Sequence, residues 1–221
     1  MRRVLVLRPE PGASATIERA RALGLDAVGV PLFEVEALPW EAPEPSGFDG
    51  LLLTSANAVR HGGEELLKLR GLEVYAVGDA TAEAAREAGF DIAATGDSGV
   101  DRLLASIEAD LKLLHPCGED RREAQNARQR IASISVYRAK PVDSPDLGPA
   151  RGAVALVHSP RAGRRLAELM SDRASVAIAA ISPAAAEAAG DGWELVETAT
   201  EPNDDALLAL AARLCNNPPP E

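Results

Sequence analysis

Short hydrophobic runs recur along the chain and are separated by alanine-rich stretches with helical spacing. The runs lie at 4–7, 51–53, 74–77, 92–94, 134–137, 154–157, 176–180 and 195–196. Most are continuous rather than alternating, which is typical of parallel strands that are covered on both faces. The stretches between them, such as 81–88 and 204–214, predict helices. This alternation predicts right-handed strand–helix–strand units and open α/β sheets.

Three separated blocks of the sequence recur at one offset. Residues 51–60 resemble 155–164, residues 78–85 resemble 182–189, and residues 101–105 match 205–209, each 104 positions apart. Alanine matches count for little in so alanine-rich a chain. Identical pairs nevertheless remain for Leu52, Ser55, Arg60, Glu83, Asp101, Leu103 and Leu104. Three blocks in one register indicate an internal repeat of an α/β unit.

The order of the repeat is permuted. Leu7-Arg8-Pro9 opens the chain and resembles Leu114-His115-Pro116, which comes last in the middle segment. Each is expected to precede an arginine-rich helix, so the first strand–helix unit completes the carboxy-terminal half. The predicted fold class is therefore α/β, with two similar open parallel-sheet (flavodoxin-like) domains joined by a two-stranded hinge, the second inserted into the first. The predicted boundaries are 1–34 with 140–221 for one domain and 35–139 for the inserted one.

The predicted hinge suggests where a ligand would bind. The chain must cross between the domains twice, and the candidate crossings are residues 27–35 and 134–140. Phe33 and Tyr137, one in each crossing, are again 104 positions apart. Two similar lobes on a hinge leave a cleft, which is the usual place for a small ligand.

The charge balance excludes several classes of partner. The chain has 23 basic and 34 acidic residues and a net charge of −11, which argues against nucleic acid because phosphate binding needs basic patches. No hydrophobic run approaches the length of a membrane span. The first run ends at Arg8-Pro9, too early for a signal peptide, so a cytoplasmic protein is expected. The two cysteines lie outside any C-x-x-C and the three histidines are far apart, so no metal site is predicted.

Small and capping residues follow the predicted strands. They lie at 54–57, 78–81, 116–119, 159–161 and 182–183. In an open α/β sheet the strand-to-helix turns share the carboxyl edge, where ligands bind, and helix amino termini suit anions. A single such turn is better explained as a helix cap. Five turns at the carboxyl edges favour an anion site, whereas Arg161 can equally be part of an anion clamp or of a solvated helix face.

Recognised catalytic motifs are absent from the sequence. It has no glycine-rich dinucleotide or phosphate-binding motif, no nucleophile elbow and no H-E-x-x-H. Cys117 is interpreted as a small buried residue rather than a nucleophile, because no partner histidine is identified. Tyr137 is either a half-buried structural residue or a hydroxyl group that faces the cleft. The residues alone therefore leave the chemistry open.

Several of these stretches together resemble the uroporphyrinogen-III synthase family. The matching stretches are 53–59, 75–82, 116–119, 136–139, 158–161 and 201–204, in the family's order over nearly the whole chain. The resemblance implies two α/β lobes, a monomer, no cofactor and no metal. It also implies a lyase of tetrapyrrole (haem) biosynthesis. Such an enzyme closes hydroxymethylbilane to uroporphyrinogen III with loss of water and inversion of the terminal pyrrole, through an azafulvene cation and a spiro intermediate.

The resemblance also implies roles for particular residues. Tyr137 matches the family's best candidate acid, which assists departure of the hydroxyl group. The implied substrate-binding residues are Arg8, Thr54, Ser55, Asn57, Gly78, Thr81, Cys117, Gly118, Arg138, Ser159, Arg161 and Ser182. The chain departs from several relatives at Ala184-Ala185, where they carry threonine. The substrate carries eight carboxylates and the chain is acidic, so binding must depend on local hydrogen-bond donors.

The implied partners are the small-molecule substrate and, as a candidate, the preceding enzyme of the pathway. One alternative stays open, which is a two-lobed protein that binds small anions without catalysis.

Overall fold

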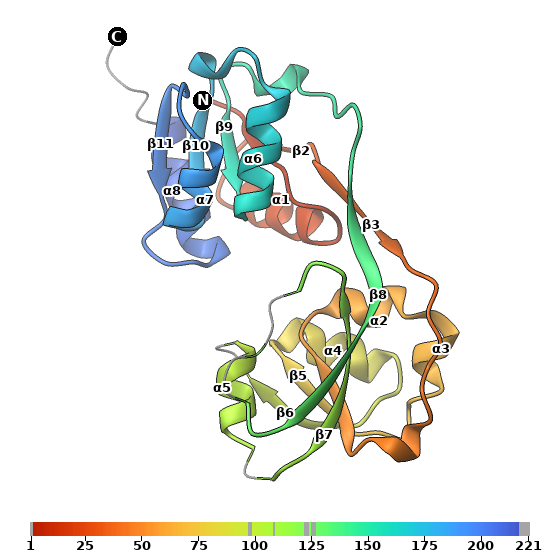
Figure 1. Ribbon diagram of the computed structural model, residues 1–221. Coiled ribbons are helices and arrows are strands. Elements are labelled where there is room, and N and C mark those ends of the chain that lie inside the picture. The colour runs from red at the N-terminus through yellow and green to blue at the C-terminus, as the bar shows by residue number, and fades with distance from the viewer. Residues whose placement is uncertain (1, 97–98, 108, 122–123, 125–126, 217–221) are drawn as a thin grey trace. The chain divides into compact units, whose positions relative to one another are not determined.

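The computed structural model describes residues 2–96, 99–107, 109–121, 124 and 127–216 (Figure 1). The chain divides into two compact units, Met1–Glu34 with Pro141–Glu221, and Val35–Lys140. The first unit contains β1 (Val4–Val6), α1 (Gly12–Ala22), β2 (Ala27–Gly29), β9 (Val154–Val157), α6 (Pro160–Leu169), β10 (Ala177–Ala180), α7 (Pro183–Ala189), β11 (Leu195–Thr198) and α8 (Asp204–Asn216). The second contains β4 (Gly50–Leu53), α2 (Ala56–His61), α3 (Gly63–Leu67), β5 (Val74–Val77), α4 (Asp79–Glu87), β6 (Ile92–Gly96), α5 (Val100–Ala105) and β7 (Lys112–Gly118). Strands β3 (Phe33–Ala37) and β8 (Arg130–Pro141) each cross the boundary between the units.

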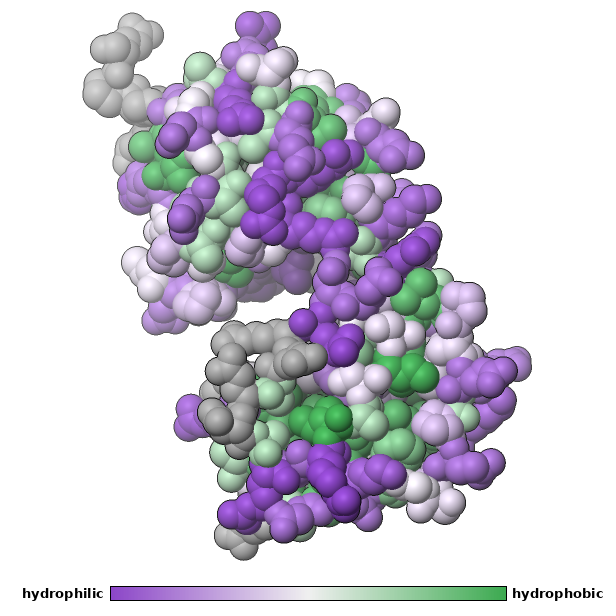
Figure 2. Space-filling model, in the orientation of Figure 1, coloured by the Kyte–Doolittle hydropathy of each residue, from purple (hydrophilic) through white to green (hydrophobic). Residues whose placement is uncertain are grey.

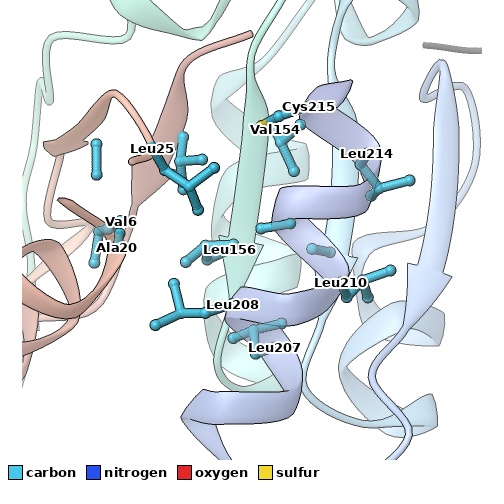
Figure 3. Close-up of a cluster of buried hydrophobic side chains, with 14 of the residues drawn as sticks. Val6, Ala20, Leu25, Val154, Leu156, Leu207, Leu208, Leu210, Leu214 and Cys215 are labelled. Atoms are coloured by element: carbon cyan, nitrogen blue, oxygen red, sulfur yellow. The ribbon is translucent and has the colours of Figure 1, made fainter. Parts of the chain in front are cut away.

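The sheet of the first unit has the strand order β11-β10-β9-β1-β2, and its neighbouring strands are parallel. Numbered within the unit, this is the 2-1-3-4-5 order of flavodoxin-like folds. Helices α1 and α8 bury their apolar residues against one face of the sheet (Figure 3). There, Leu207 and Leu208 of α8 pack with Val6 and Leu156 of the central strands. This packing holds the first turn of α8 beside the carboxyl ends of β1 and β9.

Helices α6 and α7 lie on the other side of this sheet and approach each other closely (Figure 1). A Cβ atom at Gly163 of α6 would lie 2.9 Å from the backbone oxygen of Ala185 and 2.9 Å from the nitrogen of Ala189, both in α7. Only glycine therefore lets the two helices come this near without a shift of the backbone.

The sheet of the second unit repeats the first in permuted chain order. Its strand order is β3-β8-β7-β4-β5-β6. Five of its strands match those of the first sheet in order: β6, β5, β4, β7 and β8 take the places that β11, β10, β9, β1 and β2 have in the first sheet. In the first unit β9, β10 and β11 follow β1 and β2 along the chain. In the second unit their equivalents β4, β5 and β6 precede β7 and β8, which confirms the predicted permuted repeat. Strand β3 is the addition, at the edge beside β8.

Three predictions of local structure were wrong, in residues 27–35 and 112–129. Residues 27–29, expected in a crossing, form β2 of the first sheet, and 33–37 form β3. Pro116, Cys117 and Gly118, expected in a strand-to-helix turn, lie within β7. No described residue between 119 and 129 is helical, so the arginine-rich helix expected there is not found in the described part of the chain. Pro116 is tolerated because β4 pairs only with Leu113 and Leu114 of β7.

Few large hydrophobic side chains are exposed in the described part of the chain. Figure 2 shows hydrophilic residues across the visible face of each unit, with hydrophobic residues scattered among them. The large hydrophobic side chains that are exposed in the described part of the chain are Leu23 after α1, Leu67 in α3 and Val196 in β11. None of the described helices is both long and apolar enough to cross a bilayer.

Candidate functional site

Each sheet has one point at which the chain connections diverge to opposite sides. It lies between β1 and β9 in the first unit and between β4 and β7 in the second. Ligands of open α/β sheets bind outside the carboxyl ends of the strands at such switch points. The predicted residues Arg8, Thr54, Ser55 and Ser159 all follow the strands that flank these two points.

The switch point of the first unit holds a charged cluster around Asp204, the first residue of α8. His158 follows β9, and its Nε2 lies 2.9 Å from Oδ1 of Asp204. The hydroxyl group of Thr16 donates to Oδ2 of Asp204 at 2.7 Å. Nη1 of Arg8 lies 3.4 Å from the same carboxylate, and Nη1 of Arg19 lies 3.2 Å from it. The packing of α8 on the sheet therefore brings together residues that are up to 196 positions apart.

The electrostatics of this cluster keep Asp204 ionised. Burial acts to raise the pKa of Asp204, but hydrogen bonds from His158 and Thr16 and the positive charge of Arg8 outweigh it and lower the pKa to about 2. An ionised carboxylate only accepts hydrogen bonds, so Nε2 of His158 carries the shared hydrogen. Nδ1 of His158 is buried and has no hydrogen-bond partner among the described residues.

The switch point of the second unit contains a neutral histidine, His115, and two hydroxyl groups in place of the charged cluster. Nε2 of His115, in β7, lies 3.0 Å from the hydroxyl oxygen of Thr54, and its Nδ1 lies 3.4 Å from that of Ser133. Burial, assisted by the positive charge of Arg121, lowers the pKa of His115 to about 4, so the ring is neutral at pH 7. A pocket of about 200 Å³ adjoins this group, lined by Leu52, Val100, His115, Arg121, Ala124, Ile131 and Ser133.

Three of the predicted serines cap helices at the carboxyl edges. The oxygens of Ser55, Ser159 and Ser182 accept from backbone N–H groups at 3.2, 3.2 and 3.3 Å, at the starts of α2, α6 and α7. The capping alternative is thus confirmed for all three. Capping uses a lone pair of the oxygen and leaves the hydroxyl hydrogen able to donate to a ligand.

The other predicted residues at helix starts differ in accessibility. Gly78 precedes α4 with a φ of 83°, a conformation that favours glycine. Thr81, in the first turn of α4, is only 5% exposed. Asn57 is half-buried, and its backbone N–H donates to Ser55.

The predicted residues of β7 and β8 lie side by side. Tyr137 is half-buried, and its ring covers Gly118, where a Cβ atom would lie 2.9 Å from the ring. The ring of His61 lies 6.1 Å from that of Tyr137, centroid to centroid. Cys117 is buried, and its thiol donates to the carbonyl of Ile134 at 3.4 Å. Burial raises the pKa of this thiol, which agrees with a buried residue rather than a nucleophile.

The two predicted arginines outside the cluster have partners within their own units. Arg138 forms an ion pair with Glu36 of β3. The guanidinium of Arg161 lies 4.4 Å from the ring centroid of Phe33.

The sequence did not reveal the partners of the two histidines. In the sequence, His158 and Asp204 lie in separate stretches that resemble the family, and His115 is distinguished only by its resemblance to Arg8. The one available signal was the repeat itself, because it aligns Thr54 with His158, two residues that can both hydrogen-bond. Among the described residues, no group of three or more histidine, cysteine, aspartate or glutamate side chains is placed to hold a metal ion.

Comparisons with known proteins agree with this architecture. The family model described as uroporphyrinogen-III synthase HemD matches residues 14–209. The crystal structure of uroporphyrinogen-III synthetase from Helicobacter pylori is similar, with a TM-score of 0.66 and 17% identity over 97% of this chain and 100% of that one. A mutant uroporphyrinogen III synthase from Thermus thermophilus gives a TM-score of 0.54 and 20% identity over 98% and 100% of the two chains. At these identities the structures show the fold, whereas the family model spans most of the sequence. The chain belongs to the uroporphyrinogen-III synthase family.

Proposed function

We propose that this chain closes hydroxymethylbilane to uroporphyrinogen III, with loss of water and inversion of the terminal pyrrole, and that Tyr137 acts as the acid. The observation that carries the proposal is the family match, which extends over residues 14–209 and so includes the turns that follow β9 and β10 in the first sheet and β4 and β5 in the second. The reaction class is that of a lyase of tetrapyrrole biosynthesis. It requires no cofactor, since the substrate supplies both the leaving group and the attacking carbon.

In the proposed first step, Tyr137 gives its hydroxyl proton to the leaving hydroxyl group. The carbon–oxygen bond breaks, water departs and an azafulvene cation remains. The terminal pyrrole then attacks this cation through its substituted carbon, and the spiro intermediate breaks open and closes again. The tyrosine regains a proton when the closed ring loses one. Contact with Gly118 fixes the Tyr137 ring, so the hydroxyl group is held in a defined place.

Binding of the substrate is proposed to depend on donors at the carboxyl edges. Long-range attraction is absent because the chain has a net charge of −11 and the substrate is itself an anion. The capping hydroxyl groups of Ser55, Ser159 and Ser182 are proposed to donate to its acetate and propionate groups. Arg138 and Arg161 add charge, each held by a partner within its own unit. The proposed binding set also includes Arg8, Thr54, Asn57, Gly78, Thr81, Cys117 and Gly118.

The deciding experiment supplies freshly made hydroxymethylbilane and analyses the oxidised porphyrin isomers. The substrate also closes without enzyme, to the uninverted isomer, so the inverted isomer III is the specific product. Formation of isomer I alone, with binding retained, would favour the alternative of a non-catalytic anion-binding protein.

The role of Tyr137 is tested by Tyr137→Phe, with Tyr75→Phe as the matched control because Tyr75 is the only other tyrosine. Removing the acid is expected to lower kcat on the order of 100-fold with little change in KM. The control variant is expected to keep the native kcat. An unchanged kcat for Tyr137→Phe would remove the tyrosine from the mechanism.

The setting of the enzyme is also a proposal. A monomer is supported by the scattered placement of the exposed hydrophobic residues in the described part of the chain. A cytoplasmic location is supported by Cys117 and Cys215, which are both free thiols, as expected in a reducing compartment. The preceding pathway enzyme is the proposed partner, since it would deliver an unstable substrate. Sedimentation of the purified chain, alone and with that enzyme, tests both assignments.

A further inference from the structure

The pocket of the second unit and the charged cluster of the first occupy equivalent places in the repeat. At the offset of 104, Leu52 corresponds to Leu156, Thr54 to His158 and Val100 to Asp204. His115 corresponds to Arg8 through the two leucine–x–proline stretches. Both groups lie where the first turn of the last helix meets the two central strands. The pocket of about 200 Å³ therefore corresponds to the region that contains the Asp204 carboxylate in the first unit.

The charged cluster of the first unit contains a carboxylate of the chain, whereas the equivalent position in the second unit has none. In the first unit Asp204 supplies one, and Thr16, His158 and Arg8 surround it. In the second unit the residue at that position is Val100, which has no charge. The residues that line the pocket still include three that suit an anion, namely Arg121, Ser133 and His115.

We infer that this pocket binds a carboxylate group of a small molecule, in the place that Asp204 takes in the first unit. Arg121 provides the charge and Ser133 a hydroxyl donor, while Leu52, Val100 and Ile131 contact the aliphatic part of the ligand. The ligand is a short-chain carboxylate, either free or as a side chain of the tetrapyrrole. The inference concerns a site on the side of the sheet that carries α5, and carboxylate binding to it does not require the proposed reaction.

His115 reports on the occupant because it lies in the pocket wall. A carboxylate beside the ring favours the protonated form, so binding raises the pKa of His115 from about 4. Among the described residues, the charged group that acts on the ring is Arg121, on the segment after β7.

The test is an NMR titration of the histidine ring signals of the whole chain with sodium propionate, with sodium chloride at equal ionic strength as the reference. The His115 signals are assigned by their loss in His115→Gln. Saturable shifts of His115 are expected, with a dissociation constant on the order of 1 mM for so small a ligand. The signals of His61, which faces Tyr137 instead, are expected to stay in place.

Val100→Asp is the decisive variant, because it gives the second unit the residue that the first unit has. It is expected to weaken propionate binding at least about tenfold, since a carboxylate of the chain then occupies the site. Val196→Asp is the matched control, with the same added charge on an exposed residue of β11, and it is expected to bind like the native chain. If Val100→Asp fails to fold, Arg121→Gln serves instead and is expected to weaken binding to a similar extent.

Two results would overturn the inference: no saturable shift of His115 in the native chain, or equal binding by Val100→Asp and the native chain. The source of the carboxylate is then read from the synthase assay. A raised KM for hydroxymethylbilane in Val100→Asp, with native KM in Val196→Asp, assigns the site to a substrate side chain. A native KM in both variants assigns it to a free small carboxylic acid. If the assay shows no synthase activity at all, the propionate titration still decides the carboxylate site.

Discussion

The two units of this chain have the same strand order but different electrostatics at the same place in the fold. In the first unit the switch point contains an ionised carboxylate with two arginines, a threonine and a histidine around it. In the second unit the switch point contains a neutral histidine held by two hydroxyl groups, beside a pocket. A repeated topology therefore fixes where side chains meet, whereas the residue types at those positions decide whether the site is filled or open.

The stability of the charged cluster in the first unit depends on Asp204 more than on any of its partners, because four side chains converge on this one carboxylate. Removing it leaves His158, which is only 10% exposed in its side chain, without an acceptor at Nε2. It also leaves Arg8 and Thr16 without their shared partner. The loss of one member of a mostly buried group costs more than the whole group contributes, because the remaining members stay desolvated.

Asp204→Ala is therefore expected to have the largest effect, lowering the free energy of unfolding of the first unit by about 3 to 4 kcal/mol. Asp205→Ala is the matched control, because Asp205 is also in the first turn of α8 but is 90% exposed in its side chain. Its cost is expected to stay below about 1 kcal/mol. Hydrogen exchange of the amides of β9 and α8, compared with those of β4 and β7, measures the loss in each unit. Equal losses for the two variants would contradict the assigned role of the cluster.

The buried, neutral His115 is expected to make the stability of the second unit more sensitive to acid than that of the first. The pKa of His115 is lowered from 6.5 to about 4 in the folded chain, so the unfolded chain takes up its proton first as the pH falls. Stability is full above pH 6.5 and decreases down to about pH 4, by about 2 to 3 kcal/mol. The lowered pKa of Asp204, from 3.8 to about 2, acts in a different window, because its contribution is lost only below pH 3.8.

Hydrogen exchange at pH 7 and pH 4.5 tests this difference. The β7 amides are expected to lose protection at pH 4.5, after correction for the intrinsic exchange rate, while those of β9 keep theirs. The pKa of His61, in the same unit, is also lowered by burial. His115→Gln separates the two histidines, because it is expected to remove most of the pH dependence and leave only the smaller part due to His61. Loss of protection in β9 at the same pH would contradict the assignment of acid sensitivity to the second unit.

Most of the sheet architecture could be predicted because the central strands are continuous hydrophobic runs and because the repeat ordered them. Strand β7 was missed because His115 and Pro116 interrupt its hydrophobic pattern. Strand β8 extends from 130 to 141, beyond the predicted 134–137, because many of its outer residues are polar and its burial pattern is mixed. A half-exposed strand does not show the continuous apolar run by which covered strands are recognised.

The candidate site could be predicted only where its signal is local. A serine directly after a strand and before a helix predicts a cap from sequence alone, and Ser55, Ser159 and Ser182 are caps. The pair of His158 and Asp204 is separated by 46 positions, so it forms only through the packing of α8 on β9. The same limit applies to His115 and Thr54, whose contact depends on the register of β4 and β7.

The smallest expected effect concerns the capping serine that the two switch points share. Ser55 and Ser159 occupy equivalent positions, and each caps a helix at 3.2 Å, Ser55 through the N–H of Asn57 and Ser159 through that of Ala162. Ser55→Ala and Ser159→Ala are therefore expected to cost about 1 kcal/mol each, in their own unit. Substitution by glycine at either position is the control and is expected to cost only a few tenths of that amount, since glycine also suits an N-cap.

The same variants separate capping from substrate binding. Both alanine and glycine remove the hydroxyl hydrogen, so a serine that donates to a substrate carboxylate raises KM equally in both variants, although only alanine lowers the stability appreciably. If KM rises in the alanine variant but stays close to the native value in the glycine variant, KM follows stability. That serine would then have the capping role alone. The residue before the serine is Thr54 in one unit and His158 in the other. An effect on KM at one position alone would indicate that the surroundings of each serine decide which cap also binds substrate.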